Sequence, residues 1–409
     1  MKILVIGSGG REHAIAWRLS REGHQVFGVP GNPGVAQVGA ILASTEYLGV
    51  AESVRPDLTV VGPEVPLVAG IVDQFRAQGL AVVGPTQENA QLEGSKIYAK
   101  EFMQRVGIPT ARFVRTESVE TAIEALAKFD YPVAVKADGL AAGKGVIIAH
   151  SRAEAESAVR SLGPRLVIEE FLRGEEVSFI VLSDGRTVLP LEATQDHKTV
   201  YDGDTGPNTG GMGAYCDGRI LSTADTGRVL DTIIEPAVRA TNFTGFLYAG
   251  LMMTADGPKV IEFNVRLGDP ETQPLMHRLE GGFGDALLRA ATGNLRGTTL
   301  RSKPEPSVCV VLAAHGYPGQ VRTGDTITGI DAAVEAQNVQ VFHAGTKLGI
   351  QGLETSGGRV LGVTGSGPDL ASAVRNTYAA VEKIHFAGMH YRRDIARKGL
   401  ERWPQAARQ

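Results

Sequence analysis

The stretch Lys136-Ala137-Asp138-Gly139-Leu140-Ala141-Ala142-Gly143-Lys144-Gly145-Val146 decides among the folds open to this chain. Its glycines and its second lysine suggest a P-loop, but only three residues separate Gly139 from Gly143, and Gly145 replaces the Ser or Thr that would hold Mg²⁺. A P-loop also joins a strand to a helix, whereas apolar runs typical of strands flank this segment on both sides. A glycine-rich hairpin can instead close over a triphosphate, with its backbone N–H groups facing the anion. We therefore expect a hairpin here that carries Lys144 towards a nucleotide.

Lys136 belongs to the strand that leads into this hairpin. Side chains alternate along the run at 132–137, so Lys136 takes the face opposite to the valines and can meet Lys144. The alternative is an exposed hairpin with two solvated lysines. A protein-kinase arrangement is excluded, because its glycine loop precedes the strand lysine and neither His-Arg-Asp nor Asp-Phe-Gly follows in this sequence.

The run at 259–266, Lys-Val-Ile-Glu-Phe-Asn-Val-Arg, is the second informative stretch. With a period of two, Glu262, Asn264 and Arg266 share one face of a strand while the apolar residues between them face the core. Two oxygen ligands suit Mg²⁺, which takes few protein carboxylates and keeps several waters. A neighbouring guanidinium would then bind a phosphoryl oxygen in bidentate fashion. The alternative is an exposed Glu–Arg pair on a sheet face, which contributes little.

The run at 166–172, followed by Gly174, Glu175 and Glu176, is the third. A strand that ends in a short linker between two lobes can offer backbone groups to adenine, and Glu176 can accept hydrogen bonds from ribose hydroxyls. An ordinary strand end is an equally good interpretation of these residues alone. Their position after the two lysines favours the nucleotide.

Residues 196–213 read Asp-His-Lys-Thr-Val-Tyr-Asp-Gly-Asp-Thr-Gly-Pro-Asn-Thr-Gly-Gly-Met-Gly. We expect a long loop, and unstructured loops beyond about 12–15 residues inside compact domains are usually functional or disordered. The Asn-Thr-Gly-Gly-Met-Gly end is not a disorder composition, so the loop is predicted to face substrate. His197 is a candidate proton carrier, although an orienting role is the favoured interpretation.

The first 95 residues alternate short apolar runs with helical patterns, which is typical of βαβ units around a parallel sheet. The predicted strands are 2–6, 25–29, 58–61 and 81–83, and the predicted helices are 11–22 and 67–78. Gly/Pro turns follow these strands, and ligands of such sheets bind at the carboxyl ends of the strands. A nicotinamide-dependent oxidoreductase is a rival, but Glu12 occupies the position of the third glycine of its fingerprint.

Composition narrows the class of protein. The chain has 409 residues, 43% of them hydrophobic, which allows two to four domains. Its net charge of −4 gives no basic footprint for nucleic acid, and two cysteines are too few for a disulfide framework. The apolar run near the N-terminus is too short for a signal sequence, and no run reaches membrane-spanning length. We expect a cytoplasmic monomer without a nucleic-acid or membrane partner.

Read in order, these stretches resemble the ATP-grasp superfamily, and within it the glycinamide ribonucleotide synthetase (phosphoribosylamine–glycine ligase) family. The resemblance covers essentially the whole chain and is most specific in Asp-Gly-Leu-Ala-Ala-Gly-Lys-Gly and Gly-Pro-Asn-Thr-Gly-Gly-Met-Gly. It also includes Gly-Ser-Gly-Gly-Arg-Glu-His-Ala at 7–14, Leu-Glu-Gly-Ser-Lys at 92–96 and Val-Phe-His-Ala-Gly-Thr at 341–346. Three positions depart from the pattern: Thr199 in place of Arg, Leu267 in place of Phe, and Cys216 in place of Ser or Pro. Thr199 weakens any substrate role at its position.

The resemblance implies an α/β multidomain ATP-grasp fold. It would comprise an N-terminal Rossmann-like domain (1–100), an ATP-grasp region (101–300) with an inserted α+β lid at about 115–185, and a C-terminal α/β domain (301–409). The implied ATP-binding residues are Lys100, Lys136, Lys144, Glu169, Leu172 and Glu176. The implied ligands of Mg²⁺ or Mn²⁺ are Glu262 and Asn264, and the implied catalytic residues are Arg266 and Lys136. The implied substrate-binding residues are Gly9, Gly10, Gly62, Pro63, Glu64, Asn208, Thr209, Gly210, Gly211, Met212 and Arg266.

The activity that this resemblance implies is ATP-dependent ligation of glycine to 5-phosphoribosylamine in purine biosynthesis. A carboxylate is a poor acyl donor, so γ-phosphoryl transfer to glycine would first form an acyl phosphate, which the amine then attacks. Two further alternatives stay open: a non-catalytic nucleotide sensor, and a related ATP-grasp carboxylase that uses bicarbonate in place of glycine.

Overall fold

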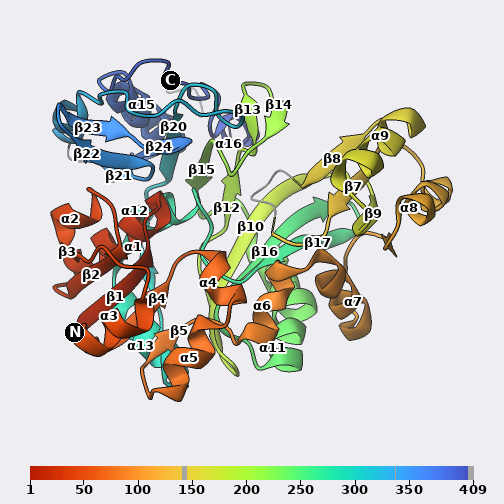
Figure 1. Ribbon diagram of the computed structural model, residues 1–409, viewed down its shortest axis with the longest axis horizontal. Coiled ribbons are helices and arrows are strands. Elements are labelled where there is room, and N and C mark those ends of the chain that lie inside the picture. The colour runs from red at the N-terminus through yellow and green to blue at the C-terminus, as the bar shows by residue number, and fades with distance from the viewer. Residues whose placement is uncertain (141–144, 337, 404–409) are drawn as a thin grey trace.

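The computed structural model describes residues 1–140, 145–336 and 338–403. Its N-terminal part is a parallel sheet of order β3-β2-β1-β4-β5, with the elements β1 Lys2–Gly7, β2 Gln25–Pro30, β3 Ala40–Ile41, β4 Leu58–Val61 and β5 Val82–Val83. Helices α1 Gly10–Arg21, α2 Val35–Val38, α3 Tyr47–Val54, α4 Glu64–Val68, α5 Ile71–Ala77 and α6 Gln87–Gly94 surround it (Figure 1). The structure contains a strand at each of the four predicted ranges, so these predictions are confirmed. The sequence signal was a continuous apolar run, which is typical of a parallel strand covered on both faces.

The predicted helix at 67–78 is wrong in one respect. The structure has two short helices, α4 and α5, and Gly70 between them has a φ of 84°. Helical residues need negative φ, so a left-handed glycine ends the first helix and lets the second begin in a new direction.

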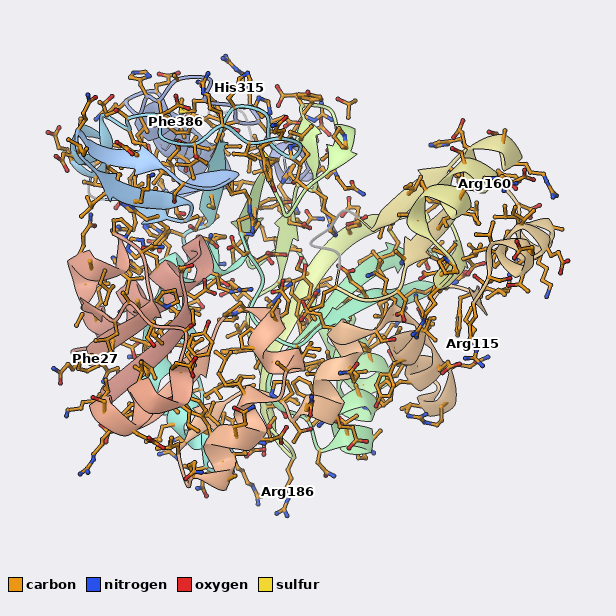
Figure 2. The ribbon with its side chains drawn as sticks, viewed as in Figure 1. Phe27, Arg115, Arg160, Arg186, His315 and Phe386 are labelled. Carbon is orange, nitrogen blue, oxygen red and sulfur yellow. The ribbon has the colours of Figure 1, made fainter. Side chains whose placement is uncertain are left out.

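A separate four-stranded sheet of order β6-β9-β7-β8 lies in the region predicted to be the lid, with β6 Phe113–Thr116, β7 Val133–Ala137, β8 Val146–Ala149 and β9 Leu166–Glu170. Helices α8 Val119–Ala125 and α9 Arg152–Leu162 pack on it and bury a small core of their own. Strands β7 and β8 pair antiparallel, as expected for the glycine-rich hairpin. Arg115 and Arg160 belong to this outlying part, far from Phe27 of the N-terminal sheet (Figure 2).

The largest sheet joins the middle of the chain to its C-terminal part. It has nine strands, with the main order β17-β16-β10-β12-β15-β20-β24-β21 and β11 beside β10. The strands are β10 Glu175–Asp184, β11 Val188–Pro190, β12 Thr194–Asp196, β15 Gly213–Cys216, β16 Thr244–Thr254, β17 Gly257–Asn264, β20 Ser307–Ala313, β21 Val339–His343 and β24 Arg359–Ser366. The predicted lid range of about 115–185 includes β10, which pairs in this sheet instead. The sheet contains strands from both sides of the predicted domain boundary at residue 301, since β15 pairs with β20. The domain division at that residue stays a prediction.

The segment expected as a long loop at 196–213 contains a hairpin of β13 Thr199–Tyr201 and β14 Thr205–Asn208. Two further hairpins are β18 Leu279–Gly281 with β19 Arg301–Ser302, and β22 Thr346–Gly349 with β23 Gly352–Thr355. The remaining helices are α7 Lys96–Val106, α10 Thr223–Val229, α11 Glu235–Thr241, α12 Thr272–Arg278, α13 Phe283–Ala291, α14 Ile330–Val334, α15 Leu370–Val381 and α16 Arg397–Arg402, with a π-helical turn at Leu230–Ile234. Among the described residues, no helix combines the length and apolar character needed to cross a bilayer.

Candidate active site

Lys100 and Lys136 converge on one buried carboxylate. Lys100 comes from α7, Lys136 from β7 and Glu169 from β9, and all three side chains are at most 7% exposed. The Lys100 ammonium lies 2.8 Å from one Glu169 oxygen, and the Lys136 ammonium lies 3.0 Å from the other. Three elements of distant sequence therefore place two cations side by side, with one anion to balance them.

The electrostatics of this trio leave Lys100 easy to deprotonate. Burial lowers the pKa of Lys100 to about 8, and the attraction of Glu169 only partly opposes that effect, while Lys136 adds to it. Burial raises the pKa of Glu169, but the two lysines outweigh burial and hold the pKa below its ordinary value. A polyanion arriving here would restore the charge balance that one carboxylate leaves incomplete.

Glu169 was expected to contact adenine, and that role stays a prediction. Its side chain holds the two lysines, and its backbone lies inside β9 between two paired strands. Leu172 is half-buried in the short connection to β10, where an adenine contact remains a prediction. Glu176 is exposed at the start of β10 and pairs with Lys198 at 2.5 Å, which lowers its pKa. Lys144 lies outside the described residues.

The lid reaches the strand that carries the predicted metal ligands. The Lys136 ammonium lies 3.4 Å from the backbone carbonyl of Ile261 on β17, directly before Glu262. This contact joins the lysines to the Glu262 face. A single nucleotide bound by both the lysines and Glu262 would require them to lie this close together.

Glu262 and Asn264 can supply part of the ligand set of a magnesium ion. They are half-buried, lie two residues apart on β17, and so share one face of the strand. Glu262 lies opposite Gly250, and its Cγ packs over this glycine. Within the described ranges, no group of three or more His, Cys, Asp or Glu side chains is arranged around a common metal position. One carboxylate and one amide oxygen suit an ion that takes its remaining ligands from water and phosphates.

Arg266 is held between two carboxylates. Its guanidinium lies 2.7 Å from Glu93 and 3.3 Å from Glu64, and it also donates to Asn264 at 3.3 Å. Burial lowers the pKa of Arg266, but Glu93 and Glu64 outweigh burial and raise the pKa above its ordinary value. The structure thus brings together three of the predicted site residues: Arg266, Asn264 and Glu64. The raised pKa of Arg266 keeps its guanidinium protonated.

A pocket of about 480 Å³ lies where the N-terminal sheet meets the C-terminal strands. Polar side chains and glycine backbone line it, from loops that come after β1 and β2, from the turn before α12, and from the segments around β22 and β24. The lining residues are Ser8, Gly9, Pro30, Gly31, Asn32, Asp269, Ala344, Gly345, Thr346, Ser356 and Arg359. The pocket is large enough for a sugar phosphate and has one guanidinium and one carboxylate in its wall.

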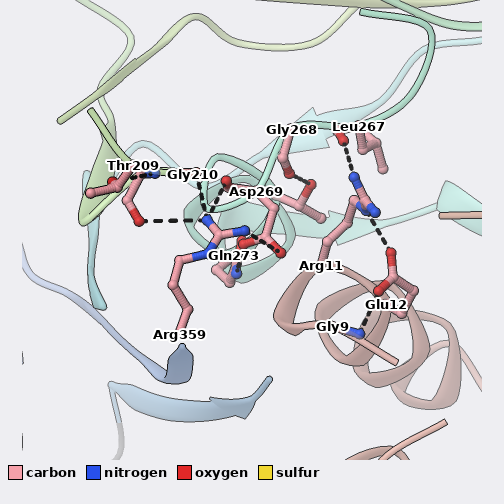
Figure 3. Close-up of polar contacts among 12 residues, drawn as sticks. Gly9, Arg11, Glu12, Thr209, Gly210, Leu267, Gly268, Asp269, Gln273 and Arg359 are labelled. Atoms are coloured by element: carbon pink, nitrogen blue, oxygen red, sulfur yellow. Dashed lines mark hydrogen bonds and ion pairs between the residues drawn. The ribbon is translucent and has the colours of Figure 1, made fainter. Parts of the chain in front are cut away.

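Arg359 joins two loops beside this pocket (Figure 3). Its Nη1 donates to the carbonyls of Gly210 at 2.6 Å and Asp269 at 2.7 Å, and its Nη2 lies 3.5 Å from the Asp269 carboxylate. Burial lowers the pKa of Arg359, but Asp269 outweighs burial and the pKa is raised. Next to this link, a Cβ on Gly211 would meet the ring of Pro270, so only glycine allows the loops to approach so closely.

The predicted N-terminal loop is only partly free to bind a ligand. Gly9 lines the pocket, but its N–H donates to Glu12 at 2.6 Å, and Arg11 pairs with the same carboxylate at 2.5 Å (Figure 3). A Cβ on Gly62 would collide with Glu12, so Gly62 packs behind the loop. Gly10 packs against Gln273 in the same manner. Pro63 caps α4, which carries Glu64 to Arg266.

Some residues of the loop at 208–213 stabilise the loop itself, and others lie beside the candidate site. Thr209 donates to the Lys198 carbonyl at 2.8 Å and accepts from the Gly211 N–H at 2.9 Å. The side chain of Met212 is fully buried against a small core, its N–H donates to the His197 carbonyl at 2.8 Å, and its carbonyl accepts from the Val311 N–H at 3.0 Å. A substrate contact of Met212 stays a prediction. Asn208 is half-buried at the end of β14, and Gly210 is exposed beside Arg359.

Sequence reasoning missed several residues of this region. Arg359 comes from the C-terminal third of the chain, and no local motif marks it as a neighbour of residues 8–32. Thr346 ends the string at 341–346 that carries part of the resemblance, but its place in the pocket was not predicted. Asn32 lies in one of the Gly/Pro turns that follow the N-terminal strands, where ligand binding was expected. Asp269 lies in the turn Gly268-Asp269-Pro270-Glu271, which directly follows the stretch at 259–266. The sequence signal that could have identified such residues is a Gly/Pro turn after a strand, because ligands bind at the carboxyl ends of parallel strands.

Comparison with known proteins agrees with this architecture. The models of the phosphoribosylglycinamide synthetase N domain, ATP-grasp (A) domain and C domain match residues 1–93, 94–272 and 307–398. The chain is 49% identical to the phosphoribosylamine–glycine ligase of Xylella fastidiosa, with 98% of this chain and 99% of that protein covered. It is 48% identical to the ligase of the same name from Pseudomonas aeruginosa, with 98% and 99% covered.

Solved structures show the same fold. The crystal structure of phosphoribosylamine–glycine ligase from Thermotoga maritima is similar with a TM-score of 0.85 and 36% identity, covering 97% of this chain and 100% of that one. The biotin carboxylase domain of Hydrogenobacter thermophilus 2-oxoglutarate carboxylase shares the fold at a TM-score of 0.72 and 19% identity, covering 95% and 91% of the two chains. The expected ATP-grasp fold class is thus confirmed, and the chain belongs to the phosphoribosylglycinamide synthetase (phosphoribosylamine–glycine ligase) family.

Proposed function

We propose that this chain ligates glycine to 5-phosphoribosylamine, with ATP converted to ADP and phosphate, and so forms glycinamide ribonucleotide for purine biosynthesis. Membership of the family supports the overall reaction. The single structural observation that carries the proposal is the contact of Lys136 with β17 at Ile261, since it joins two phosphate-binding cations to the Glu262 face. A triphosphate that touches both sides satisfies charges that the protein alone leaves unbalanced.

The reaction proceeds in two displacements. A carboxylate oxygen of glycine attacks the γ-phosphorus, the bond between that phosphorus and the bridging oxygen breaks, and ADP leaves. The amine of phosphoribosylamine then attacks the carbonyl carbon of glycyl phosphate, the C–O bond to phosphate breaks, and the amine loses a proton. Positioning and charge neutralisation by Lys100, Lys136 and Arg266 supply most of the catalysis.

Glu262 and Asn264 would hold Mg²⁺ or Mn²⁺, which when bound neutralises charge on the phosphates. Arg266 stays charged between Glu64 and Glu93, and from there it stabilises negative charge that develops on the transferred phosphoryl group or on the acyl phosphate. Closure of the lid, whose glycine-rich hairpin starts at β7, excludes water that would otherwise hydrolyse the acyl phosphate.

No side chain is required as a dedicated base in this proposal. Burial lowers the pKa of His197 to about 4, with Arg392 and Lys398 contributing, so at neutral pH the imidazole is uncharged and only a weak base. Its ring lies 6.4 Å from that of Tyr215, and its backbone pairs with Gly213 and Met212. These contacts support the orienting role.

The phosphoribosyl group of the amine substrate fits the 480 Å³ pocket. Glycine backbone and the hydroxyls of Ser8, Thr346 and Ser356 can bind its phosphate, and Asp269 can accept hydrogen bonds from ribose hydroxyls. The loop at 208–213 contacts Lys198 through Thr209 and Arg359 through Gly210, and this position beside the pocket supports a role for the loop on the glycine side of the reaction. A cytoplasmic monomer completes the proposal.

The deciding experiment measures ADP release with ATP and glycine, with and without phosphoribosylamine generated in solution. We expect release that requires both substrates, together with formation of glycinamide ribonucleotide. ADP release with bicarbonate in place of glycine would favour the carboxylase alternative, and ATP binding without any ADP release would favour a nucleotide sensor.

A further inference from the structure

His343, the last residue of β21, carries a buried imidazole beside the 480 Å³ pocket. The residue is 2% exposed, and its Nδ1 lies 3.1 Å from the Oγ1 atom of Thr346, which lines the pocket. Its Nε2 has no hydrogen-bond partner among the described residues. Within that part of the chain, the contact with Thr346 is therefore the one hydrogen bond of the ring.

The backbone of His343 is fixed from the N-terminal part of the chain. Its N–H donates to Nδ1 of His13 on α1 at 2.8 Å, and its carbonyl accepts from Nδ2 of Asn32 at 2.8 Å. The same Asn32 nitrogen donates to the carbonyl of Ser8 at 2.8 Å, and both of these residues line the pocket. A Cβ on Gly34 would collide with the His13 ring and with the Cβ of His343, so the segments are closely packed. The imidazole of His343 thus has a fixed position relative to the N-terminal wall of the pocket.

The tautomer of this imidazole decides what Thr346 can offer to a ligand. Burial lowers the pKa of His343 to about 4, so the ring is uncharged at neutral pH and has a single N–H. If Nδ1 accepts, the hydroxyl proton of Thr346 is used on the ring. If Nδ1 donates, that proton is free to point into the pocket. Since Nε2 lacks a described partner in either tautomer, only Thr346 and its ligand can decide between the two.

The other polar groups of the pocket leave a need for hydroxyl donors. Arg359 is the one cation among the lining residues, and its Nη1 already donates to the carbonyls of Gly210 and Asp269. Its Nη2 lies 3.5 Å from the Asp269 carboxylate. A phosphate monoester is mainly a dianion at neutral pH and presents three strong acceptor oxygens. Much of its binding here must therefore come from N–H and O–H groups of uncharged residues.

From this geometry we propose that His343 is a positioning residue for the phosphate of the amine substrate: its Nδ1–H donates to Oγ1 of Thr346 and so leaves the hydroxyl proton for a phosphate oxygen. The inference rests on the proposed function and deepens it, because His343 is not itself among the residues that line the pocket. It acts through Thr346 alone. A substitution that keeps a donor at the position of Nδ1 should therefore keep this role.

Asparagine and leucine at position 343 form a matched pair. The Asn amide nitrogen can take the place of Nδ1, whereas Leu has nearly the same shape and no donor, and both leave the same space where the rest of the ring was. Binding of ribose 5-phosphate, a stable probe with the same phosphoribosyl group, is measured by titration calorimetry at neutral pH. We expect the Kd of His343→Leu to exceed that of His343→Asn by about tenfold, as for the loss of one hydrogen bond. In ligation assays the KM for phosphoribosylamine should show the same difference, while kcat and the KM for ATP change little.

A second comparison tests whether the effect passes through Thr346. Thr346→Val removes the hydroxyl at nearly constant shape and should itself weaken binding of ribose 5-phosphate by about tenfold. In the Thr346→Val background, His343→Asn and His343→Leu should bind the probe equally, since the group on which they act is gone. The structural control is His277→Asn, because His277 is also buried and its Nδ1 lies 3.5 Å from the Ser307 hydroxyl. This control should lose stability and keep the Kd for the probe.

Equal Kd values for His343→Asn and His343→Leu would overturn the inference, and so would a difference that survives in the Thr346→Val background. A wild-type protein that does not bind ribose 5-phosphate would overturn it as well. A wild-type protein that binds the probe but releases no ADP with glycine and phosphoribosylamine would contradict the proposed function. In that case the calorimetric comparison would still decide the role of His343.

Discussion

The ammonium of Lys100 lies 2.8 Å from the carboxylate of Glu169 in the interior of the protein, and the two charges come from α7 and β9. Lys136 shares the same carboxylate, so the site has more positive than negative charge before any ligand arrives. Burial of this trio is favourable only because each charge has a partner. The excess of positive charge in this trio favours the binding of a triphosphate.

The first prediction concerns pH and ATP. Because the pKa of Lys100 is lowered to about 8, the free protein loses this positive charge as pH rises through 8, and the attraction for phosphate falls with it. The kcat/KM for ATP should therefore decline above about pH 8, since this ratio reports groups of the free enzyme. In Lys100→Arg the decline should move to higher pH. A profile that is the same in both proteins would exclude Lys100 as its cause.

The second prediction concerns Arg266, whose guanidinium bridges Glu93 and Glu64. Lysine keeps the charge but has no planar fork to span both carboxylates and a phosphoryl oxygen. Arg266→Lys should lower kcat by about 100-fold, with a much smaller change in the KM for ATP. Arg239→Lys, at an exposed ion pair on α11, is the matched control. Equal kcat values for Arg266→Lys and wild type would contradict a catalytic role.

The third prediction concerns the metal. Glu262→Gln removes the one charged ligand of the pair on β17, so the Mg²⁺ concentration for half-maximal activity should rise by at least about tenfold. Glu280→Gln, which changes an exposed glutamate, should not alter it. EDTA should abolish activity in every variant, and excess Mg²⁺ should restore it. Activity that persists in EDTA would rule out the metal requirement.

The fourth prediction concerns the β13–β14 hairpin. Arg392 is 1% exposed and binds Asp394 through two bonds of 2.7 Å, Asp204 at 3.0 Å, and the hydroxyl of Thr199 at 2.9 Å. Arg392→Ala removes all of these bonds, while Asp204 keeps Lys398 at 2.9 Å and Asp394 keeps the Gly203 N–H at 2.9 Å, so the free energy of unfolding should fall by about 2 kcal/mol.

Its control is Arg393→Ala, because Arg393 is the exposed neighbour and its guanidinium lies over the Tyr391 ring, 5.6 Å from the centroid. Urea unfolding followed by circular dichroism measures both variants. Similar midpoints for the two would mean that the buried ion pairs contribute nothing to stability.

The fifth prediction concerns stability at acidic pH. Burial lowers the pKa of His277 to about 4, and nearby Lys303, Arg21 and Arg18 add to the effect, whereas the unfolded chain has a pKa near 6.5. Below about pH 6.5 the unfolded state binds the proton first, so the stability from His277 is present above that pH and is lost as pH falls towards 4. The loss should be roughly 3 kcal/mol.

His277→Gln should therefore show a shallower decline of unfolding free energy between pH 6.5 and 4 than wild type, with a lower value at pH 7. Comparing the two proteins cancels contributions from other groups, including Asp196, whose raised pKa acts with the opposite sign. Parallel curves would show that His277 does not titrate differently in the folded state.

The sequence by itself determined the local elements that depend on side-chain period and turn chemistry. The parallel strands β1, β2 and β4 follow from continuous apolar runs bounded by turns, and the β7–β8 hairpin follows from two such runs around a glycine-rich segment. The shared face of Glu262 and Asn264 follows from alternation along a strand. None of these inferences needs knowledge of neighbours distant in sequence. The family followed from long specific strings, because residues that contact one ligand stay in fixed order along the chain.

Only the tertiary structure decided which of these residues meet. The pairing of β15 with β20 brings the C-terminal third beside the centre, and so places Arg359 against Gly210 and Asp269. Glu169 binds two lysines because three separate elements pack together. Charge compensation and burial are sums over neighbours distant in sequence, and no periodicity along the chain encodes them.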